Sequence, residues 1–192
     1  MNAPPNHLPT YLTQAETRAF FAVISSVRDR ALFGVVYGYG LRAGEVALLN
    51  RDDVDLSRSR IRIRRLKGGI PGERPMFRNL CALVGRYLEN RRDHQQALFV
   101  GRQGRLGKRR IQQLFGLYAA KAGLPANHRH VHVLRHSVAV HVLDAGEEID
   151  FARDHLGHRA IQSTLIYAQV SSRRRTRAMR RLEKSADFPL PS

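Results

Sequence analysis

Apolar residues recur along this chain at spacings that predict several helices and one short pair of strands. Residues 13–16 read Thr-Gln-Ala-Glu, the form of a capping box, so we expect the first helix to begin there. A second apolar helix is expected from about residue 30 to Tyr39, where Gly40 would end it. A third, short helix is expected within residues 41–49.

A different periodicity follows. Residues 60–64 read Arg-Ile-Arg-Ile-Arg, and this strict alternation is typical of a strand with its isoleucines toward the core. The segment Lys-Gly-Gly at 67–69 predicts a turn, and residues 73–78 would return as a second strand. Because proline cannot donate a hydrogen bond to a neighbouring strand, Pro75 indicates the edge of the sheet.

Helices dominate the remainder. The segment 97–100 fits either a strand or a buried turn, and 101–107 is expected to be a flexible basic loop. The pattern therefore predicts a mixed α+β fold, mainly α-helical, with a small antiparallel β-sheet. Its later helices are expected at about 80–90, 109–122, 133–145, 148–156 and 160–169.

Length and charge narrow the class of protein. With 192 residues, we expect one folded domain over 13–170, a leader or linker stub over 1–12 and a basic tail over 171–192. The 33 Lys and Arg against 16 Asp and Glu favour a polyanionic partner, with nucleic acid ahead of an anionic membrane. The polar start resembles no signal peptide, and no apolar run is long enough for a bilayer. We therefore expect a cytoplasmic protein, associated with the bacterial nucleoid when it acts.

Two early positions could bind a phosphate. Arg42 follows the glycine that would end a helix, and Glu45 lies three residues later. A planar guanidinium can hold two phosphate oxygens at once. Lys67, at the predicted turn, could donate a proton to a leaving oxygen. Taken singly, each of these residues is more often a solvated surface charge.

The later positions add proton-transfer groups and a tyrosine. His132 and Arg135 are three residues apart, so they share one side of a helix. His158 follows Leu-Gly, and Tyr167 lies on a helix side with Ile161 and Thr164. A tyrosine on an apolar helix is usually a core residue. A histidine-rich segment can also bind metal, but no acidic or cysteine ligand accompanies this one at a familiar spacing, so we expect no metal.

Together these residues make a complete set for metal-independent phosphoryl transfer. Their order, Arg–Lys–His-x-x-Arg–His–Tyr, resembles that of the tyrosine recombinase family, also called the phage integrase family. The chain looks like a lambda-integrase-like catalytic domain over about residues 10–170. The most specific part is 132–170, which contains Leu-Arg-His, then Leu-Gly-His, and then a tyrosine.

The resemblance implies a reaction. Tyr167 would attack the scissile phosphate and leave a 3′-phosphotyrosine with a free 5′-hydroxyl. Arg42 and Arg135 would neutralise the non-bridging oxygens in the transition state. The 5′-hydroxyl of a partner strand would then displace the tyrosine, so the reaction would need no cofactor and no ATP.

The resemblance also assigns supporting roles. Lys67 would protonate the departing 5′-oxygen, and His132 would assist proton transfer at the tyrosine. His158 would donate a hydrogen bond to the phosphate, and Glu45 would support the arginines. Two departures stand out. Residues 70–72 lengthen the lysine turn, and the helical core-binding domain that usually precedes the catalytic one is not seen. We therefore expect either a fragment or a short recombinase.

The resemblance extends to partners. Double-stranded DNA at a specific site would be the substrate, bound by a homo-oligomer, expected to be a tetramer, with a possible accessory DNA-bending or recombinase partner. The tail, 171–192, would either dock on a neighbouring subunit or remain a disordered basic segment. We expect the helix near 109–122 to read bases, and substituting its glutamines by alanine to alter site preference more than affinity. Its candidate DNA-binding residues are Arg109, Arg110, Gln112 and Gln113.

Other readings stay open. A type IB topoisomerase-like enzyme would use nearly the same chemistry but rejoin the same strand. A non-catalytic DNA-binding accessory protein could keep the fold without the reaction. A basic RNA- or membrane-binding module would explain the charge but not the ordered set of residues.

Overall fold

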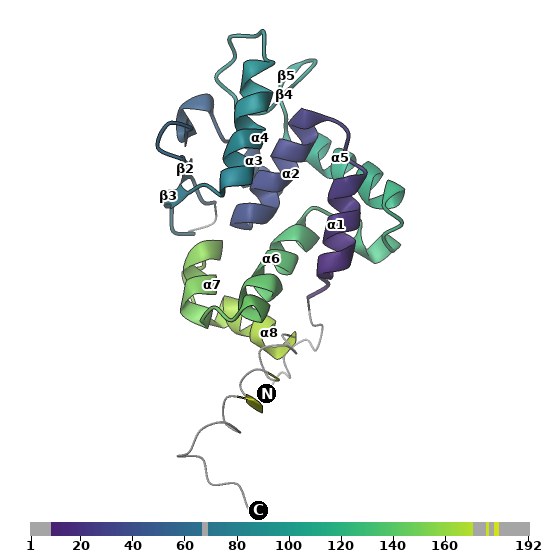
Figure 1. Cartoon of the computed structure of the whole chain (residues 1–192), viewed down its shortest axis with the longest axis vertical. Helices are drawn as coiled ribbons and strands as arrows, with labels where there is room; N and C mark the ends of the chain where they lie inside the picture. The colour runs from purple at the N-terminus through teal and green to yellow at the C-terminus, as the bar shows by residue number, and fades with distance from the viewer. Residues whose placement is uncertain (1–8, 67–68, 171–175, 177–178, 181–192) are drawn as a thin grey trace, which may run out of the picture.

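The computed structural model of the chain, shown in Figure 1, describes residues 9–66, 69–170, 176 and 179–180. Lys67 therefore lies outside the described residues. The elements are α1 (Gln14–Ala22), α2 (Val27–Tyr39), α3 (Ala43–Ala47), the 3-10 turn η1 (Arg51–Asp53), β1 (Val54–Asp55), β2 (Arg60–Ile63), β3 (Gly72–Pro75), α4 (Arg78–Glu89), β4 (Val100–Gly101), β5 (Gly104–Arg105), α5 (Lys108–Lys121), the 3-10 turn η2 (Ala126–His128), α6 (His132–Ala145), α7 (Ile149–Leu156) and α8 (Gln162–Val170).

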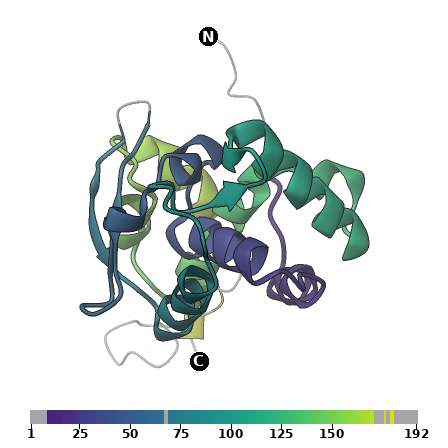
Figure 2. The same cartoon turned by 90° about the horizontal axis from the view of Figure 1, so that it is seen from above.

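Helix α2 is the centre of the arrangement. It packs against α4 on one side and α6 on another, while α7 and α8 pack on α6. Helix α5 contacts α3 and α1. In Figure 2 the blue strands β2 and β3 lie at one side of the molecule and the green-teal helix α5 at the opposite side. The predicted mainly helical α+β fold with a small antiparallel sheet is confirmed.

The ends of the first two helices follow from their capping residues. Thr13 accepts a hydrogen bond from the amide of Glu16 at 3.2 Å, and Glu16 accepts one from the amide of Thr13 at 2.7 Å, which confirms the capping box. Helix α2 begins at Val27, earlier than predicted, because Ser26 caps it. Its predicted end is confirmed: Gly40 has φ +57°, a left-handed conformation that favours glycine.

The three-stranded sheet has the order β1-β2-β3, and all its pairs are antiparallel. Ile61 and Ile63 are buried while Arg60 and Arg62, which alternate with them, are exposed, as the alternation predicted. Strand β3 is an edge strand with Pro75 paired to Arg60, but it ends there because helix α4 begins at Arg78. The return strand is therefore shorter than predicted.

The shortest elements differ from the sequence prediction. Strand β1 was not predicted, and it has only two residues, too few for a periodic pattern. The segment 101–107, expected to be a flexible loop, contains most of the β4–β5 hairpin, in which Val100 pairs with Arg105 and Gly101 with Gly104. Among the described residues, no helix combines the length and apolar character needed to cross a membrane.

The core has two parts. The larger gathers apolar side chains of α1, α2, α4, α5 and the sheet, with Phe20, Phe33 and Phe115 in contact at its centre. The smaller lies among α6, α7 and α8 and includes Leu143, Leu156 and Tyr167. The end of α2 lies where the two parts meet, and the candidate site is built around that end.

Candidate active site

The left-handed turn at Gly40 brings Arg42 to the start of α3, where it is the N-cap residue. Glu45, in the first turn of α3, accepts a hydrogen bond from the Arg42 amide at 2.9 Å and from its Nη1 at 2.8 Å. The carboxylate is 1% exposed, and the Leu66 amide donates to it at 3.2 Å. Burial alone would raise the pKa of Glu45, but the Arg42 amide and the charge on Arg65 outweigh it and hold this pKa below its usual value.

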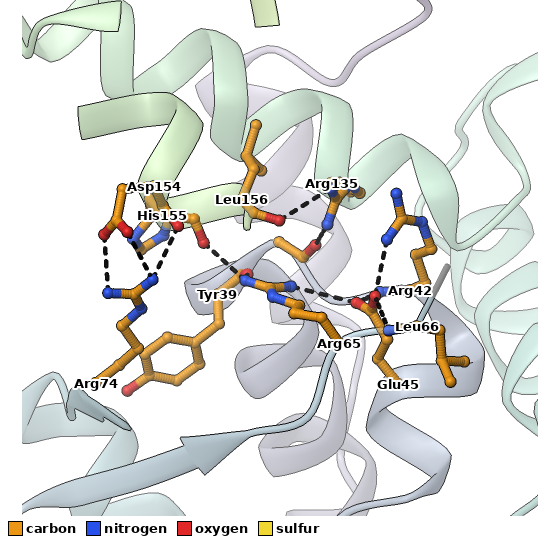
Figure 3. Close-up of polar contacts among 11 residues, drawn as sticks. Tyr39, Arg42, Glu45, Arg65, Leu66, Arg74, Arg135, Asp154, His155 and Leu156 are labelled. Carbon is orange, nitrogen blue, oxygen red and sulfur yellow. Dashed lines mark hydrogen bonds and ion pairs between the residues drawn. The ribbon is translucent and has the colours of Figure 1, made fainter. Parts of the chain in front are cut away.

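Arg65, just beyond β2, is a second partner of this carboxylate. Its Nη1 donates to Glu45 at 3.2 Å, and its Nη2 donates to the carbonyls of Tyr39 at 3.1 Å and His155 at 2.7 Å. Figure 3 shows Glu45 between Arg42 and Arg65, with Arg65 reaching across to helix α7. Burial, only partly offset by Glu45, lowers the pKa of Arg65.

Arg135, on the first turns of α6, is almost completely buried at 1% exposure. Its Nη1 donates to the carbonyl of Gly40, and its Nη2 donates to that of Leu156 at 3.0 Å (Figure 3). Burial, and then the charges on Arg42 and Arg65, lower the pKa of Arg135 to about 10. At neutral pH the side chain therefore remains charged, within electrostatic reach of the other two arginines.

His158 follows the left-handed Gly157, which ends helix α7 with φ +65°. The imidazole is 8% exposed, and its Nδ1 is 2.8 Å from the hydroxyl of Thr164 on α8. Burial, followed by the charges on Arg135 and Arg42, lowers the pKa of His158 to about 4. The ring is therefore neutral at pH 7.

Tyr167, on the same helix as Thr164, is 2% exposed. Its hydroxyl lies 2.9 Å from Nδ1 of His136, and its ring lies 6.4 Å from the His158 ring, nearly parallel to it. Burial raises the pKa of the phenol, while the charges on Arg135 and Arg42 act in the opposite direction. In this conformation the oxygen is protonated at neutral pH and faces His136.

His132 and His136 lie one turn apart on α6, with ring centroids separated by 4.4 Å. Burial, and then the neighbouring His132, lower the pKa of His136 to about 3. His132 is exposed, yet desolvation by its neighbours and the charges on Arg135 and Arg42 lower its pKa to about 4. With Arg42, Lys108 and Gln112, His132 lines a cavity of about 320 Å³.

The predicted DNA-binding residues of α5 divide into two kinds. Arg109, Arg110 and Gln113 are exposed, and Arg110 donates to Gln113 at 3.4 Å. Gln112 is half-buried; its amide oxygen accepts from the Val131 backbone at 3.2 Å, and its nitrogen lies 3.4 Å from the Arg129 carbonyl. Gln112 therefore joins α5 to the start of α6.

Two further expectations bear on the site. Lys67 was predicted to donate a proton, but it lies outside the described residues. Over the described part of the chain, no group of three or more His, Cys, Asp or Glu side chains is placed to hold a metal ion.

Sequence reasoning did not select Arg65 or His136 as site residues, although each had a signal. Positions 61, 63 and 65 fall on one face of a strand, so Arg65 is in phase with the buried Ile61 and Ile63. An arginine in phase with core residues needs acceptors inside the protein. His136 lies one helical turn after His132, and it is the residue that meets Tyr167.

The site brings together the types of side chain that phosphoryl transfer needs. Arginines from α3 and α6 supply positive charge, neutral histidines from α6 and the α7–α8 turn can exchange protons, and α8 carries a tyrosine that can become a nucleophile. The fold is that of a tyrosine recombinase catalytic domain. The sequence matches the family described as "Phage integrase family" over residues 10–174, and the chain belongs to that family.

Curated relatives agree with this membership. Tyrosine recombinase XerA of Pyrococcus horikoshii is 33% identical over 173 residues, which cover 88% of this chain and 60% of that protein. Tyrosine recombinase XerC of Chromobacterium violaceum is 41% identical over 146 residues, covering 74% of this chain and 48% of that protein. The chain thus spans about three-fifths of the length of the XerA protein and about half that of the XerC protein.

Solved structures have the same fold. The crystal structure of XerA recombinase superposes with a TM-score of 0.80 at 31% identity, covering 94% of this chain and 67% of that one. XerH site-specific recombinase, bound to palindromic difH substrate in a post-cleavage complex, superposes with a TM-score of 0.76 at 23% identity and covers 91% of this chain and 53% of that one. The similarity to XerH, at 23% identity, shows a shared fold only.

Proposed function

We propose that residues 13–170 are the catalytic domain of a site-specific recombinase that breaks and rejoins double-stranded DNA through a phosphotyrosine. The observation that carries the proposal is the meeting of Tyr167 with buried or half-buried arginines and histidines from three other parts of the chain. XerA and XerC, which are similar to this chain, are named tyrosine recombinases. We place its action in the cytoplasm, on chromosomal DNA.

In the proposed first step, the Tyr167 oxygen attacks the phosphorus and the bond from phosphorus to the 5′-oxygen breaks. The phenol loses its proton, and the departing 5′-oxygen gains one. The 3′-phosphotyrosine then reacts with the 5′-hydroxyl of another strand, and both proton transfers run in reverse. One phosphodiester is replaced by another, so no external energy source enters the balance.

The roles proposed for the described residues rest on their position and charge, and the role of Lys67 rests on the family resemblance alone. Arg42 and Arg135 neutralise the non-bridging oxygens, a kind of stabilisation whose loss typically slows an enzyme about 100- to 1000-fold. His158 donates a hydrogen bond to the same phosphate, and Glu45 holds Arg42. Lys67 is the proposed donor to the 5′-oxygen.

The Tyr167 oxygen must become accessible before it can react. Tyr167 is 2% exposed and its oxygen is paired with His136, so the attack requires α8 to shift and present the oxygen. His132, exposed beside the cavity with Arg42, is the proposed acceptor of the phenol proton after that shift. His136 holds the resting phenol.

DNA would lie across the face that carries this cavity. We propose that Arg109, Arg110 and Gln113, all exposed on α5, contact it, with the arginines on phosphates and the glutamine on a base edge. Gln112 would act indirectly, through its hydrogen bond to the start of α6.

We further propose that several copies assemble on DNA as a tetramer, each passing its C-terminal segment to a neighbour, with an accessory DNA-bending or recombinase partner where the site requires one. An apolar groove of about 580 Å³ between α2, α4, α6 and α7 would receive the segment, whose apolar residues include Met179, Leu182 and Phe188. Deleting residues 175–192 should abolish cooperative exchange while single-site cleavage persists. Cooperative exchange by the shortened chain would contradict the docking.

The test of the catalytic proposal is covalent trapping. The full chain and its Tyr167→Phe variant are incubated with nicked duplexes that carry a library of sequences, and detergent-resistant complexes are isolated and sequenced. We expect an adduct from the wild type alone, with tyrosine joined to a 3′-phosphate. Salt-sensitive DNA binding with no adduct would instead favour an accessory binder. Adducts with supercoil relaxation and no strand exchange would favour a topoisomerase.

A further inference from the structure

Arg65 is a buried charge that none of the proposed roles uses. It lies two residues beyond the end of β2, and its side chain is 1% exposed. A guanidinium cannot be buried at acceptable cost unless its N–H groups find acceptors.

The acceptors of Arg65 belong to three separate elements. One is the Glu45 carboxylate of α3, at 3.2 Å, which also holds Arg42. The others are backbone carbonyls at the ends of two helices, Tyr39 of α2 at 3.1 Å and His155 of α7 at 2.7 Å. The last carbonyls of a helix have no partner within the helix, so an external donor there stabilises the helix end.

Arg135 makes the matching pair of contacts one residue further along each helix. It donates to the carbonyls of Gly40 and Leu156, which directly follow the two carbonyls that Arg65 binds. Figure 3 shows a dashed line from each of the two guanidinium groups to a backbone oxygen of α7, that of His155 for Arg65 and that of Leu156 for Arg135. Arg135 comes from α6 and Arg65 from the sheet, so the same helix ends are held from two directions.

The backbone at Gly157 lies very close to the Arg65 side chain. Gly157, between His155 and His158, has φ +65°, and a Cβ atom added there would lie 2.6 Å from Nε of Arg65. The guanidinium therefore packs directly on the turn that leads to His158. A lysine could not replace these contacts, because one ammonium cannot match the planar fork that reaches all three elements.

We propose that Arg65 is a positioning residue of the active site, which fixes Glu45 and the Gly157–His158 turn relative to Arg42 and Arg135. Arg65 does not touch the phosphate; it determines where Arg42 and His158 meet it. The inference rests on the proposed function, because it concerns the geometry of that reaction.

The test compares Arg65→Lys and Arg65→Gln with a matched control. Arg91 is also buried, with a side chain 3% exposed, and it donates to the carbonyls of Ala97 and Leu98 and to Asp93, none of which is a site residue. Arg91→Lys therefore removes a buried arginine of the same kind from elsewhere in the fold. All variants are made in the full chain, and thermal unfolding first shows which are folded.

Two measurements follow on nicked duplexes of the sequence captured by the wild type. The first is the single-turnover rate of adduct formation at saturating protein. We expect Arg65→Lys to slow it about 10- to 100-fold, with DNA affinity within about threefold of wild type. Arg91→Lys should change the rate less than threefold.

The second measurement is the rate as a function of pH. The charge on Arg65 helps to keep Glu45 ionised, so removing it raises the pKa of Glu45 and protonates that carboxylate at a higher pH. In Arg65→Gln we therefore expect the acid limb of the profile to move to higher pH, and no such movement in Arg91→Lys. The charge on Arg65 also lowers the pKa of His158, so when Glu45→Gln is already present, Arg65→Gln should move the limb less than it does with Glu45 intact.

Wild-type rates and profiles in both Arg65 variants would overturn the inference, as would an equal loss in Arg91→Lys. If Arg65→Gln does not fold, Arg65→Lys still tests the inference. A slower rate of adduct formation with an unchanged DNA affinity would support it. A wild-type chain that forms no adduct on any duplex would count against the proposed function itself, which is a different outcome.

Discussion

The site has a charged side and a neutral side, and they are held in different ways. On the charged side, Arg42, Arg65 and Arg135 are fixed by Glu45 and by backbone carbonyls. On the neutral side, each histidine is held by a hydroxyl group: His136 by that of Tyr167, and His158 by that of Thr164. One buried carboxylate and a set of backbone carbonyls hold the first side, while the second depends on contacts between side chains of different elements.

The difference has an electrostatic cause. Burial disfavours protonated histidine, and the arginines add to this effect, so the pKa of His136 is about 3 and that of His158 about 4. The fixed positive charge thus keeps the neighbouring rings neutral. A bound phosphate would offset that charge and favour protonation of the same rings. Because the arginines and the aromatic rings are held by different contacts, substitutions on the charged side and on the neutral side should have different effects.

The largest effect is expected on the charged side, from Arg135→Lys. A lysine keeps the charge but cannot bond to both the Gly40 and the Leu156 carbonyls while facing a phosphate. We expect the single-turnover cleavage rate to fall about 100- to 1000-fold. We also expect a loss of about 1–3 kcal/mol in the free energy of unfolding, because a buried carbonyl loses its donor.

Quenched cleavage assays and urea unfolding measure the two quantities. The proposed phosphate contact predicts that DNA binding without cleavage weakens far less than the rate. A rate within threefold of wild type would show that Arg135 is a structural residue only.

A smaller effect is expected on the neutral side, from His136→Phe. This change leaves the buried Tyr167 hydroxyl without its partner, which should cost about 1–3 kcal/mol of unfolding free energy. Changing both residues to phenylalanine removes donor and acceptor together, so the double variant should recover most of that loss. Urea unfolding of the two single variants and the double variant measures the coupling; additive losses would mean that the hydrogen bond contributes nothing.

The smallest effect concerns pH. His158 has a folded-state pKa of about 4, below its unfolded value, so its contribution to stability is present above about pH 6.5 and is lost as the pH falls toward 4. Between pH 7 and pH 5 this residue should account for about 1–2 kcal/mol of the loss. His158→Gln should reduce the difference between unfolding curves recorded at those two pH values, and an unchanged difference would place the titration elsewhere.

The sequence selected candidate site residues, but it did not indicate the partners that hold them in place. Arg42, Glu45, Arg135 and Tyr167 stood out because their types and order resemble a family pattern. The buried bonds of Arg65 and Arg135 depend on where two helices end relative to each other, which no local pattern encodes. Gln112 shows the same limit, because it was expected to read bases but bonds to the backbone of Val131.

The fold shows a similar division. Helices with strong caps, such as α1 at Thr13 and α6 with Gly146 at its end, were predicted closely. The two-residue strands β1, β4 and β5 were not, because their pairing comes from tertiary contacts and not from periodicity.

The two helix ends at the site also have an electric polarity. The carbonyl end of a helix carries roughly half a negative charge, and α2 and α7 both end here. Two such ends would by themselves repel a phosphodiester. Because Arg65 and Arg135 each donate to carbonyls at both helix ends, their positive charges oppose this effect while they hold the helices together. The backbone alone would repel an anion here, and two buried arginines at the same carbonyls counteract that repulsion.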